Sequence, residues 1–229
     1  MIYSSFDLFP LWNSLRVAAI AIVVIFFLGI FLAYYISKLP RILKGIIDVI
    51  LTLPLVLPPT VCGYFLILIF GHNTPIGKFL LEIGLPFFMN WRGAILASIM
   101  VAFPLMYRTV RASFETFDEN LSDAGKTLGL SNSYIFWRIR LPACRNGIIA
   151  GTVLAFARAL GEYGATSMFV GYIQGKTATI STAVYFYWMT DHEDLAFIWV
   201  AINIAIAAIV LLTINFFERD AKGARKGVH

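Results

Sequence analysis

Long stretches of apolar residues, separated by short polar segments, dominate the chain. Five of them approach the ~20 residues that an α-helix needs to cross a ~30 Å hydrocarbon layer. They predict membrane-spanning helices at about residues 15–37, 46–70, 91–110, 146–169 and 195–217. The third stretch is the shortest, and it suffices if its flanking arginines extend along the helix toward the interfaces. An odd number of spans places the two termini on opposite sides of a membrane.

The composition agrees with a membrane protein. Hydrophobic residues make up 59% of the 229 residues and charged residues 14%, with a mean hydropathy of +0.80. Soluble domains are about 45–50% apolar and about 25% charged. The excess excludes a soluble enzyme, a disordered chain and a disulfide scaffold, and it predicts an all-α integral membrane protein. Cys62 and Cys144 fall in distant predicted elements and are not expected to form a disulfide.

Basic residues are distributed unevenly between the predicted loops. Thirteen of the eighteen Lys and Arg residues follow the first span, lie between the third and fourth, or follow the fifth. Four lie on the opposite side, and Arg158 falls inside a span. Because basic loops stay cytoplasmic, we expect the N-terminus outside and the C-terminus in the cytoplasm. The net charge of +5 is therefore a topology signal, and no nucleic-acid partner is expected.

The two predicted outer loops contain apolar segments of their own. Residues 76–83 predict a short interfacial helix. In the second loop, Tyr185, Tyr187 and Trp188 are residue types typical of a membrane–water interface. The sequence leaves open whether this second loop re-enters the membrane.

The predicted cytoplasmic loop at about residues 118–142 has an ordered pattern. Its first helix carries apolar or small residues at i, i+3, i+4 and i+7, namely Leu121, Ala124, Gly125 and Leu128. Gly129 is placed to end that helix, and Ser131 or Asn132 to cap a second one. Leu141-Pro142 is expected to break the chain before the fourth span. The small face suits either docking of a soluble partner or packing against the ends of the spans.

The same loop resembles the EAA loop of bacterial ABC-importer permeases, in which Glu-Ala-Ala is followed by three residues, Gly, nine residues and Ile-x-Leu-Pro. The matching residues are Asp123-Ala124-Gly125, Gly129 and Ile139-Arg140-Leu141-Pro142. Asp replaces the usual Glu and keeps its charge, and Gly replaces the second Ala at a helix-propensity cost of up to ~1 kcal/mol. The resemblance implies that this EAA loop docks on an ATPase subunit and couples ATP hydrolysis to the spans.

Further motifs resemble the permease subunits of molybdate importers. They are Leu53-Pro54-Leu55-Val56-Leu57-Pro58-Pro59-Thr60, Trp91-Arg92-Gly93-Ala94, Phe103-Pro104-Leu105-Met106 and the segment from Phe156 to Thr166 with its Arg-Ala-Leu-Gly-Glu core. The proline-rich block favours molybdate over the related sulfate permeases. Permeases for tungstate, and for sulfate or thiosulfate, remain alternatives.

This resemblance carries implications for fold and partners. It implies a type I, methionine-importer-like permease fold in the cytoplasmic membrane of a prokaryote. It also implies a second permease copy, ABC ATPase subunits that use ATP and Mg²⁺, and an extracytoplasmic molybdate-binding protein. The chain itself would be no enzyme and would hold no cofactor.

Two charges lie inside the predicted fourth span. Arg158 and Glu162 are four residues apart, so they share one helical face and can pair. A charge in the bilayer centre costs at least ~2.5 kcal/mol, so both must face protein or water. They either line the path of an oxyanion, with Glu162 moderating the attraction of Arg158, or lock the helix to a neighbour.

Prolines interrupt the predicted second span. Pro54, Pro58 and Pro59 lack amide donors and predict a kink. Thr52, Thr60 and nearby backbone amides are candidates for transient contact with an anion, although the kink could equally serve only to shape the helix bundle. The possible translocation pathway thus comprises Thr52, Pro58, Pro59, Thr60, Arg158 and Glu162.

Two other classes of membrane protein compete with this interpretation. A membrane enzyme needs clustered titratable groups, but His72, His192 and His229 are scattered and no nucleotide, zinc or nucleophile-elbow motif occurs. No catalytic residue and no metal site is therefore expected. A secondary transporter or channel would usually show inverted repeats or several intramembrane carboxylates, whereas Glu162 is the one candidate.

Overall fold

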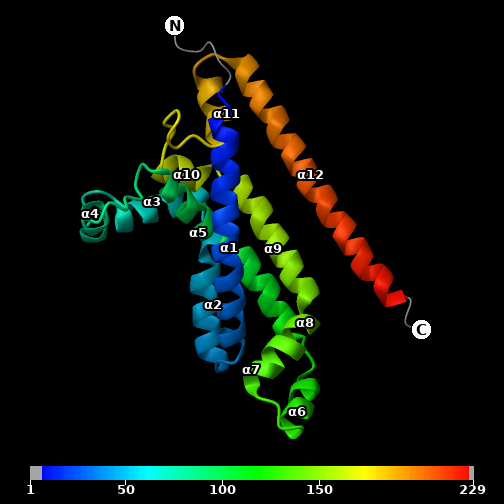
Figure 1. The fold of residues 1–229 in the computed structure, drawn as a ribbon. Coiled ribbons are helices and arrows are strands. Elements are labelled where there is room, and N and C mark those ends of the chain that lie inside the picture. Colours follow the sequence, from blue (N-terminus) through cyan, green and yellow to red (C-terminus); the bar gives the residue numbers. More distant parts are fainter. Residues whose placement is uncertain (1–6, 227–229) are drawn as a thin grey trace.

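Helices account for all regular secondary structure in the part of the chain that the computed structural model describes, residues 7–226. Four long helices set the frame (Figure 1): α1 (Phe9–Ser37), α5 (Trp91–Glu115), α9 (Arg145–Leu160) and α12 (Glu193–Lys226). Side chains of α12 are described as far as Leu212, so the predicted end of the fifth span at 217 and the basic tail lie outside the described side chains.

The core of the molecule lies where α1, α5 and α9 pack together. Met106 of α5 is fully buried at the centre of this contact. A Cβ added at Gly29 of α1 would come 2.7 Å from Met106 Cγ, and one at Gly151 of α9 would come 3.0 Å from its Sδ. Small residues at helix crossings let backbones approach closely in membranes, where packing rather than water expulsion holds helices together. These two glycines therefore permit the three-helix contact.

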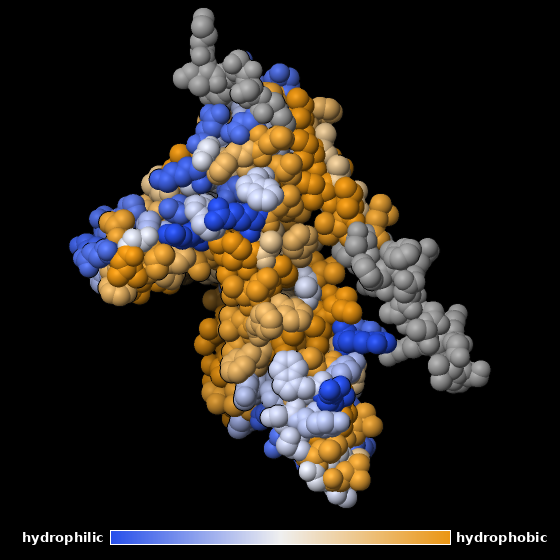
Figure 2. Space-filling model, in the orientation of Figure 1, coloured by the Kyte–Doolittle hydropathy of each residue, from blue (hydrophilic) through white to orange (hydrophobic). Residues whose placement is uncertain are grey.

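The outer surface of the middle of the bundle is apolar on the face that Figure 2 shows, and hydrophilic residues gather toward its two ends. Phe27 on α1 is 65% exposed and Phe197 on α12 is 73% exposed. A continuous apolar surface of this size needs lipid rather than water around it. By length and composition, α1, α5 and α12 are able to cross a membrane, and a bent helix pair adds a fourth candidate. The all-α membrane class is confirmed, while five spans and their orientation stay predictions.

The bent pair replaces the predicted second span. The stretch is divided between α2 (Arg41–Val56) and α3 (Pro59–Phe70), and the chain bends by 114° between them. Leu57 and Pro58 are both extended, with ψ of 142° and 135°. A residue before proline is pushed out of the helical region, and consecutive prolines repeat the effect. The predicted kink is confirmed, and it is sharp enough to divide the stretch into two helices.

The predicted fourth span is also divided. Helix α9 ends at Leu160 and α10 (Gly164–Phe169) follows after a three-residue break. The Glu162 carboxylate accepts a hydrogen bond from the Ala165 backbone N at 2.7 Å, which satisfies an amide at the start of α10. This local bond replaces helical continuity, so the expectation of one helix over 146–169 was wrong.

Two short helices lie on the predicted outer side. Helix α4 (Pro75–Glu82) is capped by Thr74, whose hydroxyl accepts from the Gly77 backbone N, and it projects sideways from the bundle (Figure 1). Helix α11 (Ile180–Met189) packs on α12 and begins with a capping box. Its preceding loop is fastened to α1 by Asn13, whose amide donates to two carbonyls there.

Four short elements form the predicted cytoplasmic loop, which lies at the lower end of the bundle in Figure 1. They are α6 (Glu119–Thr127), α7 (Asn132–Ile135), the π-helical turn η1 (Phe136–Arg140) and α8 (Leu141–Ala143). Cys62 and Cys144, which were not expected to form a disulfide, are both free and buried.

Candidate functional site

Gly129 ends the first helix of the EAA loop. Its φ is +77°, its N donates to the Lys126 carbonyl at 2.9 Å, and the Leu130 N donates to the Gly125 carbonyl at 3.0 Å. This pair of bonds is the Schellman arrangement that ends helices at a left-handed residue. The prediction that Gly129 ends this helix is confirmed. Of the two predicted caps of the next helix, Ser131 is the one used, and its hydroxyl accepts from the Tyr134 N.

Helix α6 packs on the second half of the loop through Gly125. An added Cβ there would come 3.1 Å from Ile135 Cγ1 and 3.4 Å from Ile139 Cδ1. Alanine at this position would need those side chains to give way by a few tenths of an ångström. Glycine in place of the second alanine of the family pattern therefore fits the close packing here.

The other three residues of the predicted apolar face are exposed to solvent. Leu121 is 48% exposed and Leu128 79% exposed, and Ala124 is exposed beside them. Ser122 and Gly125 are the buried members of α6. Helix α6 is thus rotated so that Gly125 packs within the loop, while Leu121, Ala124 and Leu128 remain exposed and available to a partner. We call Leu121, Ala124 and Leu128 the outward strip.

Two charged residues stand next to the outward strip. Asp123 and Lys126 pair at 2.9 Å on the exposed side of α6. The Asp123 carboxylate raises the pKa of the Lys126 ammonium, mainly through their hydrogen bond. Asp123 therefore keeps the negative charge that the family pattern has at this position on the solvent side of the helix.

A buried arginine joins the two ends of the loop. Arg140 is 6% exposed, its Nη2 lies 2.5–2.6 Å from both carboxylate oxygens of Glu119, and its guanidinium lies 4.6 Å from the Phe117 ring centroid. Charge-assisted bonds of this kind are the stronger hydrogen bonds in proteins. Sequence reasoning missed this role because position 140 is the variable one in the family pattern. A basic residue flanked by Ile139 and Leu141 was the available signal.

The junction with α9 also differs from expectation. Leu141 is helical, with φ −60° and ψ −47°, and its N donates to the Phe136 carbonyl in the widened turn η1. Pro142 follows in α8, which continues η1 without leaving helical geometry. The chain leaves helical geometry only at Cys144, so the predicted break at Leu141-Pro142 was wrong.

Arg158 and Glu162 form the predicted pair. Arg158 Nη1 lies 2.6 Å from Glu162 Oε2, an ion pair without hydrogen-bond geometry, while Oε1 holds the start of α10. Glu162 is 3% exposed and the Arg158 side chain 30% exposed. The carboxylate thus ties the guanidinium to the point where the helix breaks.

Two helix breaks meet at this point. An added Cβ at Gly164 would come 2.8 Å from Pro59 Cβ and 3.3 Å from Thr60 N, and one at Gly63 would come 2.7 Å from the Ala165 carbonyl O. We call residues 58–60 and 161–164 the broken-helix junction. Thr60, Pro59 and Glu162 were predicted pathway residues, and the structure brings their segments together.

Of the other predicted pathway residues, Pro58 and Arg158 are at the junction and Thr52 is not. Pro58 is exposed at the bend, and Arg158 reaches the junction through its pair with Glu162. Thr52 lies on α2, on the other side of the 114° bend, and its hydroxyl donates to the Asp48 carbonyl at 2.7 Å. Broken helices are tolerated at membrane depth where protein or a cavity covers the freed backbone groups.

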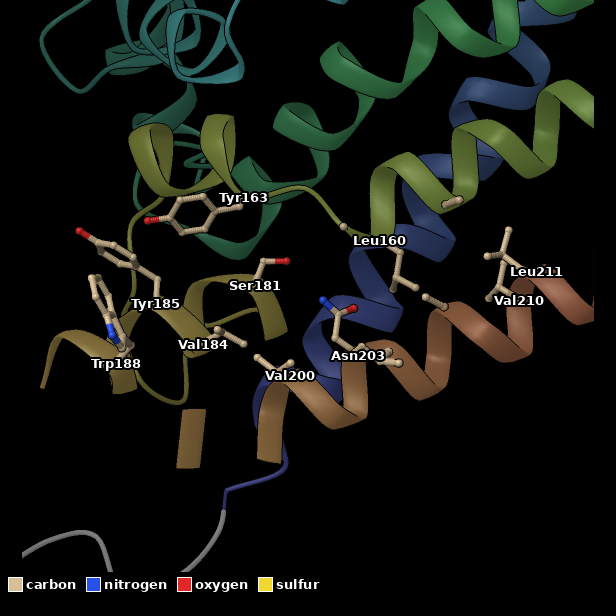
Figure 3. A pocket seen from close by; sticks show the side chains of 14 residues that line it. Leu160, Tyr163, Ser181, Val184, Tyr185, Trp188, Val200, Asn203, Val210 and Leu211 are labelled. Carbon is tan, nitrogen blue, oxygen red and sulfur yellow. The ribbon is translucent and has the colours of Figure 1, made fainter. Parts of the chain in front are cut away.

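A groove of about 610 Å³ lies beside the junction, between α9, α11 and α12 (Figure 3). Leu160, Val184 and Val200 give it an apolar wall. Tyr163 and Tyr185, with ring centroids 5.4 Å apart, and Asn203 of α12 add polar groups from three elements. From the sequence, Tyr185 was expected only at a membrane–water interface, because the contact of α11 and α12 with the junction depends on the fold.

The chain resembles known transport proteins over nearly its whole length. Residues 16–221 match the family described as binding-protein-dependent transport system inner membrane component. The molybdenum transport system permease protein ModB of Escherichia coli (strain K12) is 42% identical over 219 residues, which cover 93% of this chain and 96% of that protein. The putative molybdenum transport system permease protein YvgM of Bacillus subtilis (strain 168) is 37% identical over 207 residues, covering 90% and 91%.

Solved structures show the same fold at low identity. A bacterial ABC transporter involved in the import of the acidic polysaccharide alginate superposes with a TM-score of 0.75 at 18% identity, over 93% of this chain and 79% of that one. An inward-facing MetNI methionine ABC transporter gives 0.72 at 12% identity, over 92% and 94%. The expected type I importer permease fold is therefore confirmed. The chain belongs to the family of binding-protein-dependent transport system inner membrane components.

Proposed function

We propose that the chain is the permease subunit of an ATP-driven importer that moves molybdate across the cytoplasmic membrane. The observation that carries this proposal is the similarity to two molybdenum transport permeases across at least nine-tenths of the chain. The EAA loop, with its predicted glycine turn and an accessible outward strip, supports the importer class independently of the substrate.

The EAA loop would transmit the work of separate ATPase subunits, which bind ATP and Mg²⁺. Leu121 and Leu128 would enter a cleft of the ATPase, where burial of such side chains contributes about 1.5–3 kcal/mol each before association costs. Gly125 and Arg140 fasten α6 to η1, and η1 leads through α8 into α9. A displacement of α6 would thus reach the helix that carries Arg158.

The pathway would run along the broken-helix junction between two copies of the chain. The positive potential of Arg158 would attract the oxyanion, and Glu162 would moderate that attraction so that the ion is released. Thr60 and Pro58, exposed at the bend, would border the path, with Pro59 beneath them and Thr52 one segment away. An extracytoplasmic binding protein would supply the affinity, and ATP binding and hydrolysis would select which face is open.

The pathway role is tested with a variant that removes both charges together. Arg158→Ala/Glu162→Gln keeps an acceptor for the Ala165 N and leaves no unpaired ion. With normal assembly, lost molybdate uptake supports the pathway role, and normal uptake shows that the pair serves only to lock the fold.

The substrate and the importer class are tested in reconstituted vesicles. The chain is combined with its ATPase and binding protein, and uptake of labelled molybdate is measured with unlabelled molybdate, tungstate or sulfate as competitor. We expect ATP-dependent uptake that molybdate and tungstate suppress and sulfate does not. Competition by sulfate equal to that by molybdate would refute the substrate assignment, and ATP-independent uptake would favour a secondary transporter or channel.

A further inference from the structure

A second groove, of about 850 Å³, runs along α1 toward the EAA loop. Its long wall consists of apolar α1 side chains, including Val24, Phe27 and Phe31. The loop elements α7, η1 and α8 and the start of α9 supply the opposite wall. We call it the α1 groove. It is separate from the broken-helix junction and from the outward strip.

The α1 groove changes from apolar to polar along its length. Val24 stands at one end, and Lys38, Asn132 and Ser133 stand at the other. The helix between Val24 and Lys38 rises about 21 Å, at ~1.5 Å per residue. Half of a ~30 Å hydrocarbon core plus one headgroup layer has about this depth. The groove therefore matches a single leaflet in both length and polarity.

Aromatic side chains surround the polar end. Tyr34 and Phe136 have ring centroids 4.5 Å apart, and Trp137, whose ring lies 5.2 Å from that of Phe136, is 62% exposed. Amphipathic rings favour the level of lipid headgroups. The polar end thus has the composition of a membrane–water interface.

Lys38 supplies the charge at this end. Its Nζ lies 3.8 Å from the Tyr34 ring centroid and donates to the Tyr34 hydroxyl at 2.5 Å. Among the side chains that the structure describes, no carboxylate pairs with Lys38, whereas Lys44, Lys126 and Arg140 each have one. Arg140, 5.7 Å from the same ring, is compensated by Glu119. An anion is the complementary partner for the positive charge of Lys38.

We propose that the α1 groove binds one anionic phospholipid of the leaflet on the EAA-loop side. An acyl chain lies along Val24, Phe27 and Phe31, and the phosphate accepts from Lys38, with Asn132 and Ser133 within the polar end. Basic pockets between membrane helices bind anionic headgroups in this manner. The lipid fills the space between α1 and the segment that follows α6.

The test is lipid retention by the full chain in nanodiscs of phosphatidylcholine with a minor fraction of phosphatidylglycerol, measured by native mass spectrometry. Lys38→Ala is expected to lower retained phosphatidylglycerol about fivefold, the equivalent of the ~1 kcal/mol that a basic residue contributes near an anionic surface. Lys38→Arg should retain it. Lys78→Ala, an exposed lysine of α4, is the matched control and should leave retention unchanged.

Two further measurements locate the lipid. Ser133→Glu, at the exposed start of α7, adds a negative charge to the polar end and should also reduce retention. Brominated phosphatidylglycerol should quench the fluorescence of the parent chain more than that of Trp137→Phe. Unchanged retention in Lys38→Ala, equal retention of phosphatidylcholine, or quenching that is independent of Trp137 would each overturn the proposal.

Discussion

The EAA loop and the broken-helix junction both depend on glycine, but they are assembled over different distances in the sequence. Gly129 closes the turn that follows α6, and Arg140 reaches a partner 21 positions away. At the junction, Gly164 lies against Pro59, which comes from another part of the chain. The loop also leaves leucines exposed, whereas the junction buries a carboxylate. The first arrangement suits a surface that a partner pushes, and the second a support inside the membrane.

The largest effect is expected from Arg158→Ala. The substitution leaves the buried Glu162 without its counter-charge, and breaking a buried pair on one side costs ~3–5 kcal/mol, with the lower end expected here because Arg158 is partly exposed. Thermal unfolding of the purified chain measures the loss.

The double variant Arg158→Ala/Glu162→Gln is the control, and it should recover most of that stability. If Arg158→Ala is as stable as the parent chain, the ion pair does not support the junction.

Gly63→Ala should destabilise the junction next. An added Cβ would come 2.7 Å from the Ala165 carbonyl and 2.8 Å from Met168 Cβ, so α3 and α10 must move apart. Overpacking of this kind costs ~1–3 kcal/mol. Gly45→Ala on α2 meets nothing within 4 Å and gains helix propensity, so its melting temperature should not fall. Equal melting temperatures for both variants would contradict the close α3–α10 contact.

Gly129→Ala tests the loop at its turn. A non-glycine residue at φ +77° costs about 1–2 kcal/mol, which should distort α6 and weaken coupling more than global stability. Gly84→Ala has a similar φ of +73° but lies after α4, so it is the matched control. We expect ATP-driven uptake to fall in the first variant and to persist in the second. The same uptake in both would show that the α6 turn plays no part in coupling.

The smallest effect on the folded chain is expected at the outward strip. Leu128→Ser changes a side chain that is 79% exposed, so the free energy of unfolding should change by no more than ~0.5 kcal/mol. Affinity for the ATPase should nevertheless fall about tenfold if the leucine is an anchor of the interface. Pull-down of the ATPase by the variant, beside Leu212→Ser on α12 as an equally apolar control, measures the difference.

The two regions also differ in how far the sequence predicted them. Local signals predicted the first helix of the EAA loop, its end at Gly129 and a cap at Ser131 or Asn132, because caps and left-handed turns depend on nearest neighbours. The rotation of α6 could not be predicted from local signals, because it depends on how Gly125 packs against Ile135 in the folded loop.

The junction was predictable only in its components. The prolines indicated a kink and the charges indicated a pair, and both are present. The 114° bend, the division of the fourth span at Glu162 and the meeting of the two breaks depend on contacts between distant segments. A window of apolar residues carries no information on such contacts, so hydropathy joined α9 to α10 and α2 to α3.

The central claim is that the outward strip of the EAA loop couples a separate ATPase to molybdate movement. The most direct measurement is ATP-driven accumulation of labelled molybdate in vesicles that contain the ATPase, the binding protein and either the parent chain or Leu121→Ser/Leu128→Ser. We predict accumulation with the parent chain and none with the double variant, at equal amounts of folded permease. Equal accumulation by both, or accumulation without ATP, would contradict the account.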